Sequence, residues 1–418
     1  MIKWYKFNNF HSFLDETYVD FTSGPKSSDS DIDFDLDMNI KVSKVAAILG
    51  ANGSGKSNLM KPLAFLRWFL TSSFKDIKQR DNIPLEVHCT SKQSKTKIEI
   101  EFCIPASTDD NEIDTIECRY FVELDSTRVY HEELKLKTSR LYSRVFSRKY
   151  DVDAKRYNFN LSKFMPKDVE SIVDKTPHNA SVISFLSRLD GDDEINEKKL
   201  SVCDVVHIYF YNTETNLDLH GRYHEDIDRK ILITSEEYEK NPDIKDAVID
   251  IIKSYDMGLI DVRLIEKTII DNNGKEKNKM LPYGVHIHNG EEFMIPLNHE
   301  SSGTKAAYCM LFSLASILKY GSVAILDELD NDLHPHILIE IIDLFRNSEI
   351  NVNNAQLIMS THTPEVLKHL KRHHCFIVEK ENSVSSVWRL DEIDGLRSQD
   401  NLYVKYMTGA IGGVPSIG

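Results

Sequence analysis

A run of small residues near position 50 has the composition and spacing of a loop that binds phosphate groups. The run, with the residue that follows it, is Gly50-Ala51-Asn52-Gly53-Ser54-Gly55-Lys56-Ser57-Asn58. Glycines let the backbone wrap around phosphate oxygens and present N–H donors at a helix N-terminus, and Lys56 adds a point charge. The Ser57 hydroxyl can bind Mg²⁺, which keeps several waters and needs few protein ligands. The nine residues therefore predict a nucleoside triphosphate site.

Three further polar residues follow apolar runs that read as buried strands. Asp327 and Glu328 come directly after Val323-Ala324-Ile325-Leu326, and His362 follows the run at 356–359. Asp327 can hold Mg²⁺ through water, and Glu328 can orient or deprotonate an attacking water. A His362 imidazole could reach a γ-phosphate. Alone, an Asp-Glu pair more often caps a helix and such a histidine is more often structural, but beside a phosphate loop we predict catalytic roles for Glu328 and His362.

A serine-rich turn precedes the helix that leads to the Asp327 strand. Its residues are Ser301, Ser302, Gly303, Thr304 and Lys305. A turn of small residues at a helix N-terminus can form a second anion site, and simple phosphate-loop kinases and GTPases lack this element at this place. The alternative is an ordinary helix cap.

The periodicity of apolar residues indicates which elements position these side chains. The apolar run at 44–49 predicts a buried parallel strand before the phosphate loop, and four leucines at helical spacing predict a helix after it: Leu59, Leu63, Leu66 and Leu70. Alternation from 95 to 137 predicts an antiparallel meander. Residues 161–199 and 235–255 read as helices, with a turn at 190–193, and 272–274 as a hairpin turn. We read 22–37 as a mobile acidic loop.

These elements predict an α/β fold in which a mostly parallel phosphate-loop sheet is joined by an antiparallel β subdomain and an inserted helical region. We expect an N-terminal lobe at 1–140, an insertion at 141–290 and a C-terminal lobe at 291–418. No heptad repeat persists over three or four turns, so the sequence does not predict long coiled-coil arms.

The composition of the 418 residues is that of a soluble globular protein, with 41% hydrophobic and 28% charged residues. No apolar stretch is long enough to cross a bilayer and the start has no secretion signal, so we expect a cytoplasmic protein without a membrane partner. The six cysteines have no spacing typical of disulfides or zinc. A net charge of −15 gives no positive evidence for nucleic-acid binding, although a local basic groove stays possible.

The order of phosphate loop, serine-rich turn, Asp-Glu strand and strand-end histidine resembles the Walker A, signature, Walker B and switch-histidine motifs of the ABC ATPase superfamily. The signature here is Ser301-Ser302-Gly303-Thr304-Lys305, and Leu333-His334-Pro335 follows Walker B. The signature and the segment after Walker B both differ from those of ABC transporters. In both places the sequence resembles the soluble branch of the superfamily, which contains RecF, OLD and abortive-infection ATPases. The predicted fold is thus an ABC-ATPase head.

Three runs in the C-terminal part are Glu-Ser-Ser-Gly-Thr-Lys at 300–305, Leu-Asp-Glu-Leu-Asp at 326–330 and Ser-Thr-His-Thr-Pro at 360–364. In these runs and in the position of Walker A, the chain resembles, within that branch, the RloA/AbiL-like ATPases of bacterial phage-defence loci. The resemblance implies ATP and Mg²⁺ as cofactors and a homodimer, or a higher oligomer built on such dimers. In that dimer the signature helix of one copy completes the nucleotide site of the other. It further implies a separately encoded effector, a toxin or nuclease, whose activity the ATPase senses or gates.

Three other functions are alternatives. A RecF-like or SMC-like ATPase would act on DNA directly. A self-contained OLD-like nuclease would need a Toprim domain after Phe376-Ile377-Val378-Glu379; about forty residues follow, so we read that run as a final strand. A transporter subunit would need a Q-loop glutamine, for which Gln93 is the candidate.

The run His373-His374-Cys375 could bind a metal ion, but we favour a surface turn because three adjacent residues rarely converge on one ion. For His334 and His336 we favour roles in capping and dimer contact.

Overall fold

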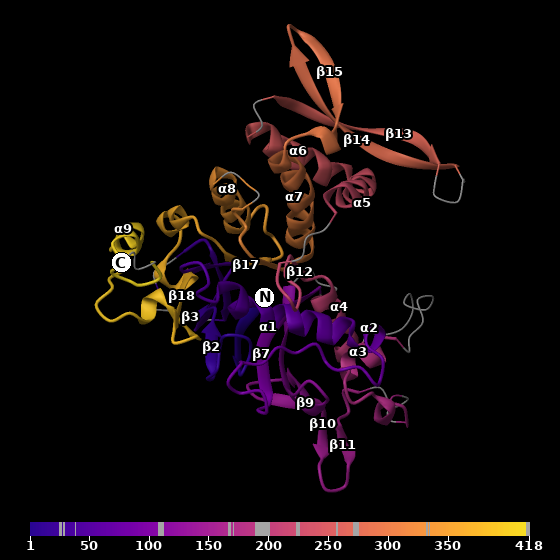
Figure 1. Ribbon diagram of the computed structural model, residues 1–418, viewed down its shortest axis with the longest axis vertical. Coiled ribbons are helices and arrows are strands. Elements are labelled where there is room, and N and C mark those ends of the chain that lie inside the picture. The colour runs from indigo at the N-terminus through magenta and orange to yellow at the C-terminus, as the bar shows by residue number, and fades with distance from the viewer. Residues whose placement is uncertain are drawn as a thin grey trace.

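The computed structural model describes residues 1–24, 27, 30–37, 39–107, 113–165, 169, 171–188, 201–222, 226–255, 258–270, 276–331, 333 and 335–414. Its central element is a six-stranded sheet, drawn in Figure 1, with strand order β12-β16-β17-β6-β18-β19. Neighbouring strands from β12 to β18 run parallel, and β19 pairs antiparallel with β18. The strands are β6 (Val45–Leu49), β12 (Glu214–Thr215), β16 (Val323–Leu326), β17 (Gln356–Ser360), β18 (Cys375–Glu381) and β19 (Val384–Arg389).

A seven-stranded antiparallel sheet, of order β11-β10-β9-β8-β7-β1-β2, forms the second layer. Its strands are β1 (Ile2–Asn8), β2 (Thr17–Asp20), β7 (Thr96–Ser107), β8 (Ile113–Leu124), β9 (Val129–Lys137), β10 (Tyr142–Asp151) and β11 (Arg156–Leu161). The predicted meander is confirmed, and the sheet continues past residue 140 to the end of β11. The division into domains at 140 and 290 stays a prediction.

Helix α1 (Lys56–Thr71) lies between these two sheets. Its four predicted leucines are all buried, and they share one apolar cluster with Ile48 of β6 and Ile98 of β7. The neighbouring residues of β6, Val45, Ala47 and Leu49, belong to a second cluster on the other face of the parallel sheet. Strand β6 is therefore buried on both faces, as is typical of a central parallel strand.

The second apolar cluster is covered by the helices of the C-terminal part and of the insertion. Helices α5 and α6 pack against α7, and α8 contributes Leu338 and Ile341 to the same core. The ranges are α5 (Ile227–Lys240), α6 (Pro242–Tyr255), α7 (Ser302–Tyr320) and α8 (Pro335–Arg346). On the α1 side lie α2 (Ser73–Asp76), α3 (Val182–Leu186) and α4 (Val202–Tyr211).

Two small sheets and several short helices complete the fold. Strands β13, β14 and β15 form an antiparallel sheet above α5 and α7, at the end of the molecule opposite β11 (Figure 1). The sheet strands are β13 (Leu259–Ile270), β14 (Glu276–His288), β15 (Glu291–Pro296), β3 (Thr22–Ser23), β4 (Asp33–Asp37) and β5 (Ile40–Ser43). The helices are η2 (Val173–Lys175), η3 (Leu297–His299), η4 (Pro364–Lys368), η5 (Arg372–His374), η6 (Leu390–Glu392) and α9 (Leu402–Met407).

The predicted α/β class is confirmed, and so is the mostly parallel sheet, but several local predictions are wrong. Residues 33–37 form strand β4 instead of a mobile loop, because Phe34 and Leu36 alternate with aspartates and pack on the cluster of Met1, Val42 and Cys103. Strand β18 is not the final strand, since β19 follows it. In the described part of 161–199 the helical segments are short, with η2 and α3 among them, whereas 235–255 is helical as predicted. The predicted turns at 190–193 and 272–274 lie outside the described residues. In the described part of the chain, no helix is long and apolar enough to span a bilayer.

Candidate functional site

The loop at 50–55 connects the carboxyl end of β6 to α1, and its glycines are required by geometry. Gly55 is the N-cap of α1 with φ of 113°, and Gly53 has φ of 76°, both in the left-handed region. A Cβ at Gly50 would lie 2.3 Å from the Val378 carbonyl oxygen, and one at Gly55 would lie 2.4 Å from the Ser385 Oγ. The loop therefore packs directly on the β18–β19 hairpin and aims the N-terminus of α1 outward.

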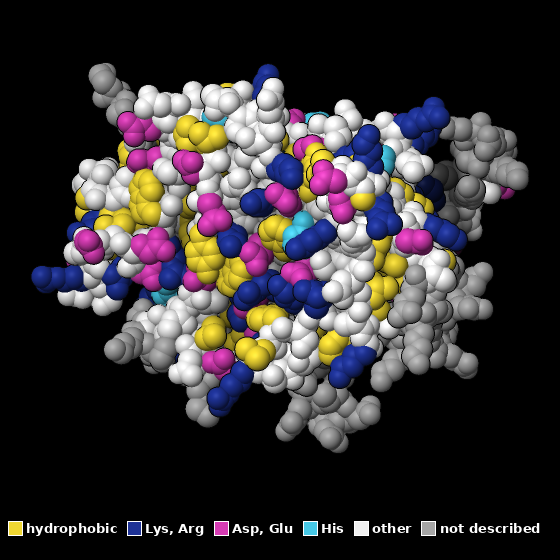
Figure 2. Space-filling view, turned by 90° about the horizontal axis from the view of Figure 1, so that it is seen from below, with side chains coloured by type: hydrophobic (Ala, Val, Ile, Leu, Met, Phe, Trp, Pro, Cys, Tyr) yellow, Lys and Arg dark blue, Asp and Glu magenta, His cyan; other side chains and the backbone are white. Residues whose placement is uncertain are grey.

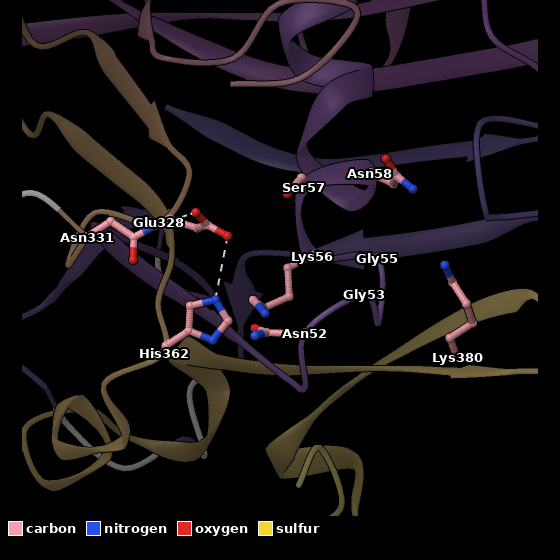
Figure 3. Close-up of a pocket in the computed structure, with 10 residues that line it drawn as sticks. All are labelled: Asn52, Gly53, Gly55, Lys56, Ser57, Asn58, Glu328, Asn331, His362 and Lys380. Atoms are coloured by element: carbon pink, nitrogen blue, oxygen red, sulfur yellow. Dashed lines mark hydrogen bonds and ion pairs between the residues drawn. The ribbon is translucent and has the colours of Figure 1, made fainter. Parts of the chain in front are cut away.

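A cavity of about 590 Å³ opens at this helix N-terminus, at the carboxyl edge of the parallel sheet (Figure 3). That volume is in the range of small-molecule sites. Its lining residues are Asn52, Gly53, Gly55, Lys56, Ser57, Asn58, Glu328, Asn331, His362 and Lys380. The structure thus places most of the predicted loop, Glu328 and His362 around one space. Two lining residues, Asn331 and Lys380, were not found from the sequence.

Lys56 is buried at the centre of the loop. Its Nζ donates to the carbonyl oxygens of Gly50 (2.9 Å) and Ala51 (3.2 Å). Burial lowers the pKa of Lys56, while the nearby carboxylates of Asp327 and Glu328 act to raise it. A buried cation favours an anionic partner, because two carbonyl dipoles replace only part of its lost hydration. Phosphate oxygens in the cavity would supply that partner.

Asp327 is held at the end of β16 by contacts from both sides. Its Oδ1 accepts a hydrogen bond from the Ser360 Oγ at 2.5 Å. The side chain of Asn216, from the segment after β12, accepts from the Asp327 backbone N–H (2.7 Å) and donates to its carbonyl oxygen (2.8 Å). Asp327 is 3% exposed, so its carboxylate has a fixed place beside the loop. No local pattern in the sequence points to Asn216, which lies 111 positions from its partner.

Glu328 is positioned by a strained backbone and two side chains. Its φ is 48°, a left-handed conformation that is uncommon for glutamate and that often accompanies a functional constraint. The Ser360 Oγ accepts from its N–H at 2.8 Å, and the Asn331 Nδ2 donates to its Oε2. Its Oε1 lies 3.6 Å from the His362 Nε2, as the dashed line in Figure 3 shows. Glu328 and His362 therefore face each other across one side of the cavity.

Asp330 fixes the backbone at His362. Its Oδ2 accepts from the His362 N–H at 3.0 Å and from the Thr363 Oγ1 at 2.9 Å. The turn after β16 is thereby tied to the turn after β17. An aspartate in a Leu-Asp-Glu-Leu-Asp run was visible in the sequence, but only the fold shows which backbone group it binds.

The turn at 301–305 forms the N-terminus of α7, as predicted. The Ser301 Oγ accepts from the Thr304 N–H at 3.1 Å, so Ser301 is the N-cap, and both Ser301 and Ser302 are exposed. Glu300, just before the turn, lies 2.7 Å from the His286 Nε2 of β14. Ser301–Lys305 are not among the described residues that line the cavity of their own chain. Gln93 is exposed in a turn and also lies outside the lining.

The prediction of a surface turn at 373–375 is wrong, because all three side chains are buried. Asp33 of β4 accepts hydrogen bonds from the Nε2 atoms of His373 and His374, each at 2.9 Å. These residue types could hold a metal ion. However, the Nδ1 of His374 accepts from the Lys371 N–H at 3.1 Å, which places the ring proton on Nε2. His374 is thus a donor to Asp33, and the cluster is a hydrogen-bonded tie. His334 lies outside the described residues, and His336 is exposed on α8.

Glu379 of β18 is engaged by the C-terminal segment. Its Oε1 accepts from the Gly413 N–H at 2.6 Å, and Tyr406 of α9 donates to the Gly413 carbonyl oxygen at 3.2 Å. The carboxylate therefore anchors the segment after α9 beside the first glycine of the loop.

The donor set around the loop fits Mg²⁺ with a triphosphate. Ser57 contributes a hydroxyl to the cavity wall, and Asp327 contributes a buried carboxylate. Hard oxygen ligands of this kind, few in number, suit a magnesium ion that keeps several waters. The N-terminus of α1 and Lys56 supply the positive field that phosphates need.

Comparison with known proteins assigns the chain at the family level. Residues 45–368 match the model of the family described as AAA domain, putative AbiEii toxin, Type IV TA system. No curated protein matches the sequence.

Solved structures with remote similarity include SMC head domains. The SMC head domain from Thermotoga maritima is 16% identical with a TM-score of 0.39, over 93% of this chain and 98% of that one. A Smc head domain with a coiled coil and joint from Pyrococcus yayanosii is 12% identical with a TM-score of 0.41, over 98% and 99%. An SmcHead bound to the C-winged helix domain of ScpA is 16% identical with a TM-score of 0.41, over 93% and 97%.

Proposed function

Because the chain belongs to the family described as AAA domain, putative AbiEii toxin, Type IV TA system, we propose that it binds and hydrolyses ATP as a molecular switch. One observation carries the proposal. A single cavity combines the phosphate loop and Lys56 on one side with Glu328 and His362 on the other. The first group suits binding of phosphates, and the second suits activation of water next to them.

Each predicted residue has a place in this reaction. Gly50–Asn58 hold the phosphates, and Ser57 and Asp327 hold Mg²⁺, which offsets phosphate charge when bound. Glu328 orients the attacking water and accepts its proton, and Asn331 keeps the carboxylate in position. His362 lines the same cavity beside Glu328, and we expect it to donate a hydrogen bond to the terminal phosphate.

The Ser301–Lys305 turn has a role only if a second copy is present. It is a capped helix N-terminus with exposed serines and lies outside the lining of its own cavity. We expect the turn of one copy to cover the nucleotide bound by the other, so that two copies enclose two ATP molecules. Hydrolysis then separates the copies, so whether the protein is a dimer depends on which nucleotide is bound.

The biological proposal is a cytoplasmic defence switch of the RloA/AbiL-like type. The family description names a putative toxin and a Type IV TA system, which supports a role in a system of this kind. On this proposal the ATPase gates a separately encoded toxin or nuclease during phage attack. Glu379, the residue that a Toprim domain would need free, is instead bonded to Gly413.

The alternative function, an ATPase that acts directly on DNA, predicts a different binding behaviour. Binding to DNA would weaken steeply with salt and strengthen with ATP. On the face shown in Figure 2, lysine and arginine side chains are interspersed with acidic ones. On the antiparallel sheet, the exposed Arg144 lies 3.0 Å from the Glu133 carboxylate. This arrangement favours the switch over direct DNA binding.

The variant Glu328→Gln tests the proposal. It removes the proton acceptor but keeps the shape, so hydrolysis should fall by about 100-fold or more while ATP binding persists. With ATP and Mg²⁺ the variant should then accumulate as a dimer in light scattering. Glu340→Gln, on the exposed side of α8, is the matched control. Equal ATP turnover by the wild type and Glu328→Gln would remove Glu328 from the catalytic site.

A further inference from the structure

The β18–β19 hairpin forms a wall of the cavity and is locked to the phosphate loop. The Ser385 Oγ donates to the Ser54 carbonyl oxygen at 2.6 Å, and the Ser385 N–H donates to the Ser12 carbonyl oxygen at 2.7 Å. Strand β18 pairs with β6 up to Ile377 and then continues beside the loop, where the Val378 carbonyl meets Gly50. The hairpin and the loop therefore form one rigid unit.

Lys380 is the residue that this wall presents to the cavity. It pairs across the hairpin with Ser385, the residue that is bonded to the loop, so its backbone has a fixed place. Neighbouring side chains of a strand point to opposite faces. Glu379 accordingly contacts Gly413, whereas Lys380 lines the cavity. Within the described part of the chain, no carboxylate lies within ion-pair distance of the Lys380 ammonium, which is exposed and available to a ligand.

The position of Lys380 indicates which part of a nucleotide it meets. In Figure 3 it lies beyond Gly53 and Gly55, on the side of the loop away from Glu328 and His362. The terminal phosphate must lie near Glu328 for hydrolysis, so the opposite end of the cavity receives the sugar-proximal end of the nucleotide. The anionic group at that end is the α-phosphate, and an ammonium group is a suitable partner for it.

We infer that Lys380 binds the α-phosphate of the nucleotide and makes the β18–β19 hairpin part of the binding site. This inference rests on the proposed ATP-binding function. It assigns a role to a strand that begins at Cys375, far from the phosphate loop in the chain, between His362 and α9.

Nucleotide affinity measured with ATP and with ADP tests the inference. Lys380→Ala should weaken both by the same factor, about 5- to 10-fold, because both nucleotides carry an α-phosphate and the contact is solvent-exposed. Lys380→Arg should retain most of the affinity. For hydrolysis, KM should rise while kcat stays within about twofold, since the reacting end is untouched.

Two controls separate this inference from its premise. Lys155→Ala removes the same charge at the exposed β10–β11 turn, and Lys56→Ala should abolish tight binding. If the wild type binds ATP and Lys380→Ala binds ATP and ADP as well as the wild type does, the inference is wrong. A loss confined to ATP would also overturn it, since the contact would then be to the terminal phosphate. If the wild type binds no ATP, the proposed function itself fails.

Discussion

Ser360 links the two carboxylates that the proposed reaction needs. Its hydroxyl donates to the Asp327 carboxylate and accepts from the Glu328 N–H, and the side chain is fully buried at the end of β17. One small side chain thereby sets the direction of the Asp327 carboxylate and supports the left-handed backbone at Glu328. Ser360 is a positioning residue, because it reaches the reaction through its neighbours.

We predict that Ser360→Ala lowers hydrolysis more than nucleotide affinity. Loss of the hydroxyl leaves a buried N–H without a partner, which should reduce the free energy of unfolding by about 1–3 kcal/mol. Hydrolysis should fall by roughly 10-fold as Glu328 loses its fixed orientation, with ATP affinity changed by less than about threefold. Ser360→Thr keeps the hydroxyl and should recover part of the rate. Equal rates in the wild type and Ser360→Ala would show that Asn331 alone is enough to orient Glu328. Ser398→Ala, on an exposed turn, is the control for loss of any serine hydroxyl.

The residues of the site differ in how far the sequence could predict them. The loop and the pair Asp327 and Glu328 were found because each follows an apolar run at a strand end, where chemistry and local pattern agree. Ser360 and Asn216 were missed because their roles are hydrogen bonds to residues far away in the chain. Lys380 was missed because a lysine between two glutamates at the end of an apolar run is a common surface pattern.

At the scale of elements, hydrogen bonds between Asp33 of β4 and the two histidines of η5 join the N-terminal segment to the segment that follows His362. Asp33 accepts from both histidines, and Lys371 fixes the tautomer of His374. Burial raises the pKa of Asp33, but the two imidazole hydrogen bonds outweigh it and hold that pKa below its ordinary value. Burial lowers the pKa of His374. The cluster is thus built for one charged aspartate and a neutral His374 that donates to it.

The pH dependence of stability should reveal this tie. Since the folded pKa of His374 is below its unfolded value of about 6.5, the unfolded chain takes up a proton that the folded chain resists. The contribution of His374 to stability is therefore present above about pH 6.5 and is lost as pH falls further. His374→Gln, which keeps an amide donor, should lower the free energy of unfolding at pH 7.5 by about 1–3 kcal/mol.

Melting temperature at pH 7.5 and pH 5.5 checks this prediction. The difference between the two temperatures should be smaller in His374→Gln than in the wild type. His288→Gln, at an exposed position of β14, should leave the difference unchanged. An undiminished pH dependence in His374→Gln would mean that other buried histidines, such as His11, whose pKa burial lowers to about 4, account for the acid sensitivity.

Element prediction from the sequence succeeded where one period extended over many residues. The leucines of α1 and the alternation of β7–β9 are long patterns, and each was identified with its correct type. Strand β4 was missed because three aspartates in five residues masked its alternation. The burial of His373 and His374 depends on Asp33, about 340 residues earlier in the chain, so no local pattern could show it.

At the scale of the whole molecule, the two proposed anion sites of one chain are carried by different elements. The phosphate loop is carried by β6 and α1, whereas the Ser301 turn is carried by α7 next to β14, to which Glu300 and His286 tie it. The turn does not line the cavity of its own chain among the described residues. A symmetric pair of copies can bring each turn to the other copy's loop, because a two-fold interface presents every contact twice.

Mixing two inactive variants tests this arrangement. Lys56→Ala disables the loop but leaves the turn intact, and Ser302→Arg blocks the exposed turn but leaves the loop intact. Neither variant alone can form a complete site, whereas a mixed dimer contains one intact loop facing one intact turn. Each mixed dimer has one of its two sites intact. The mixture should therefore recover about a quarter of wild-type hydrolysis if the copies pair at random, and about half if only mixed dimers form.

The control keeps nucleotide binding separate from assembly. Ser302→Arg by itself should bind ATP with an affinity close to that of the wild type, because its loop is unchanged, yet it should remain monomeric in light scattering with ATP and Mg²⁺. Ser398→Arg adds the same charge at an exposed turn and should retain full activity. If the mixture is no more active than its components while Ser302→Arg still binds ATP, the site is complete within one chain. The Ser301 turn would then be only the cap of α7, and nucleotide occupancy would not be coupled to assembly.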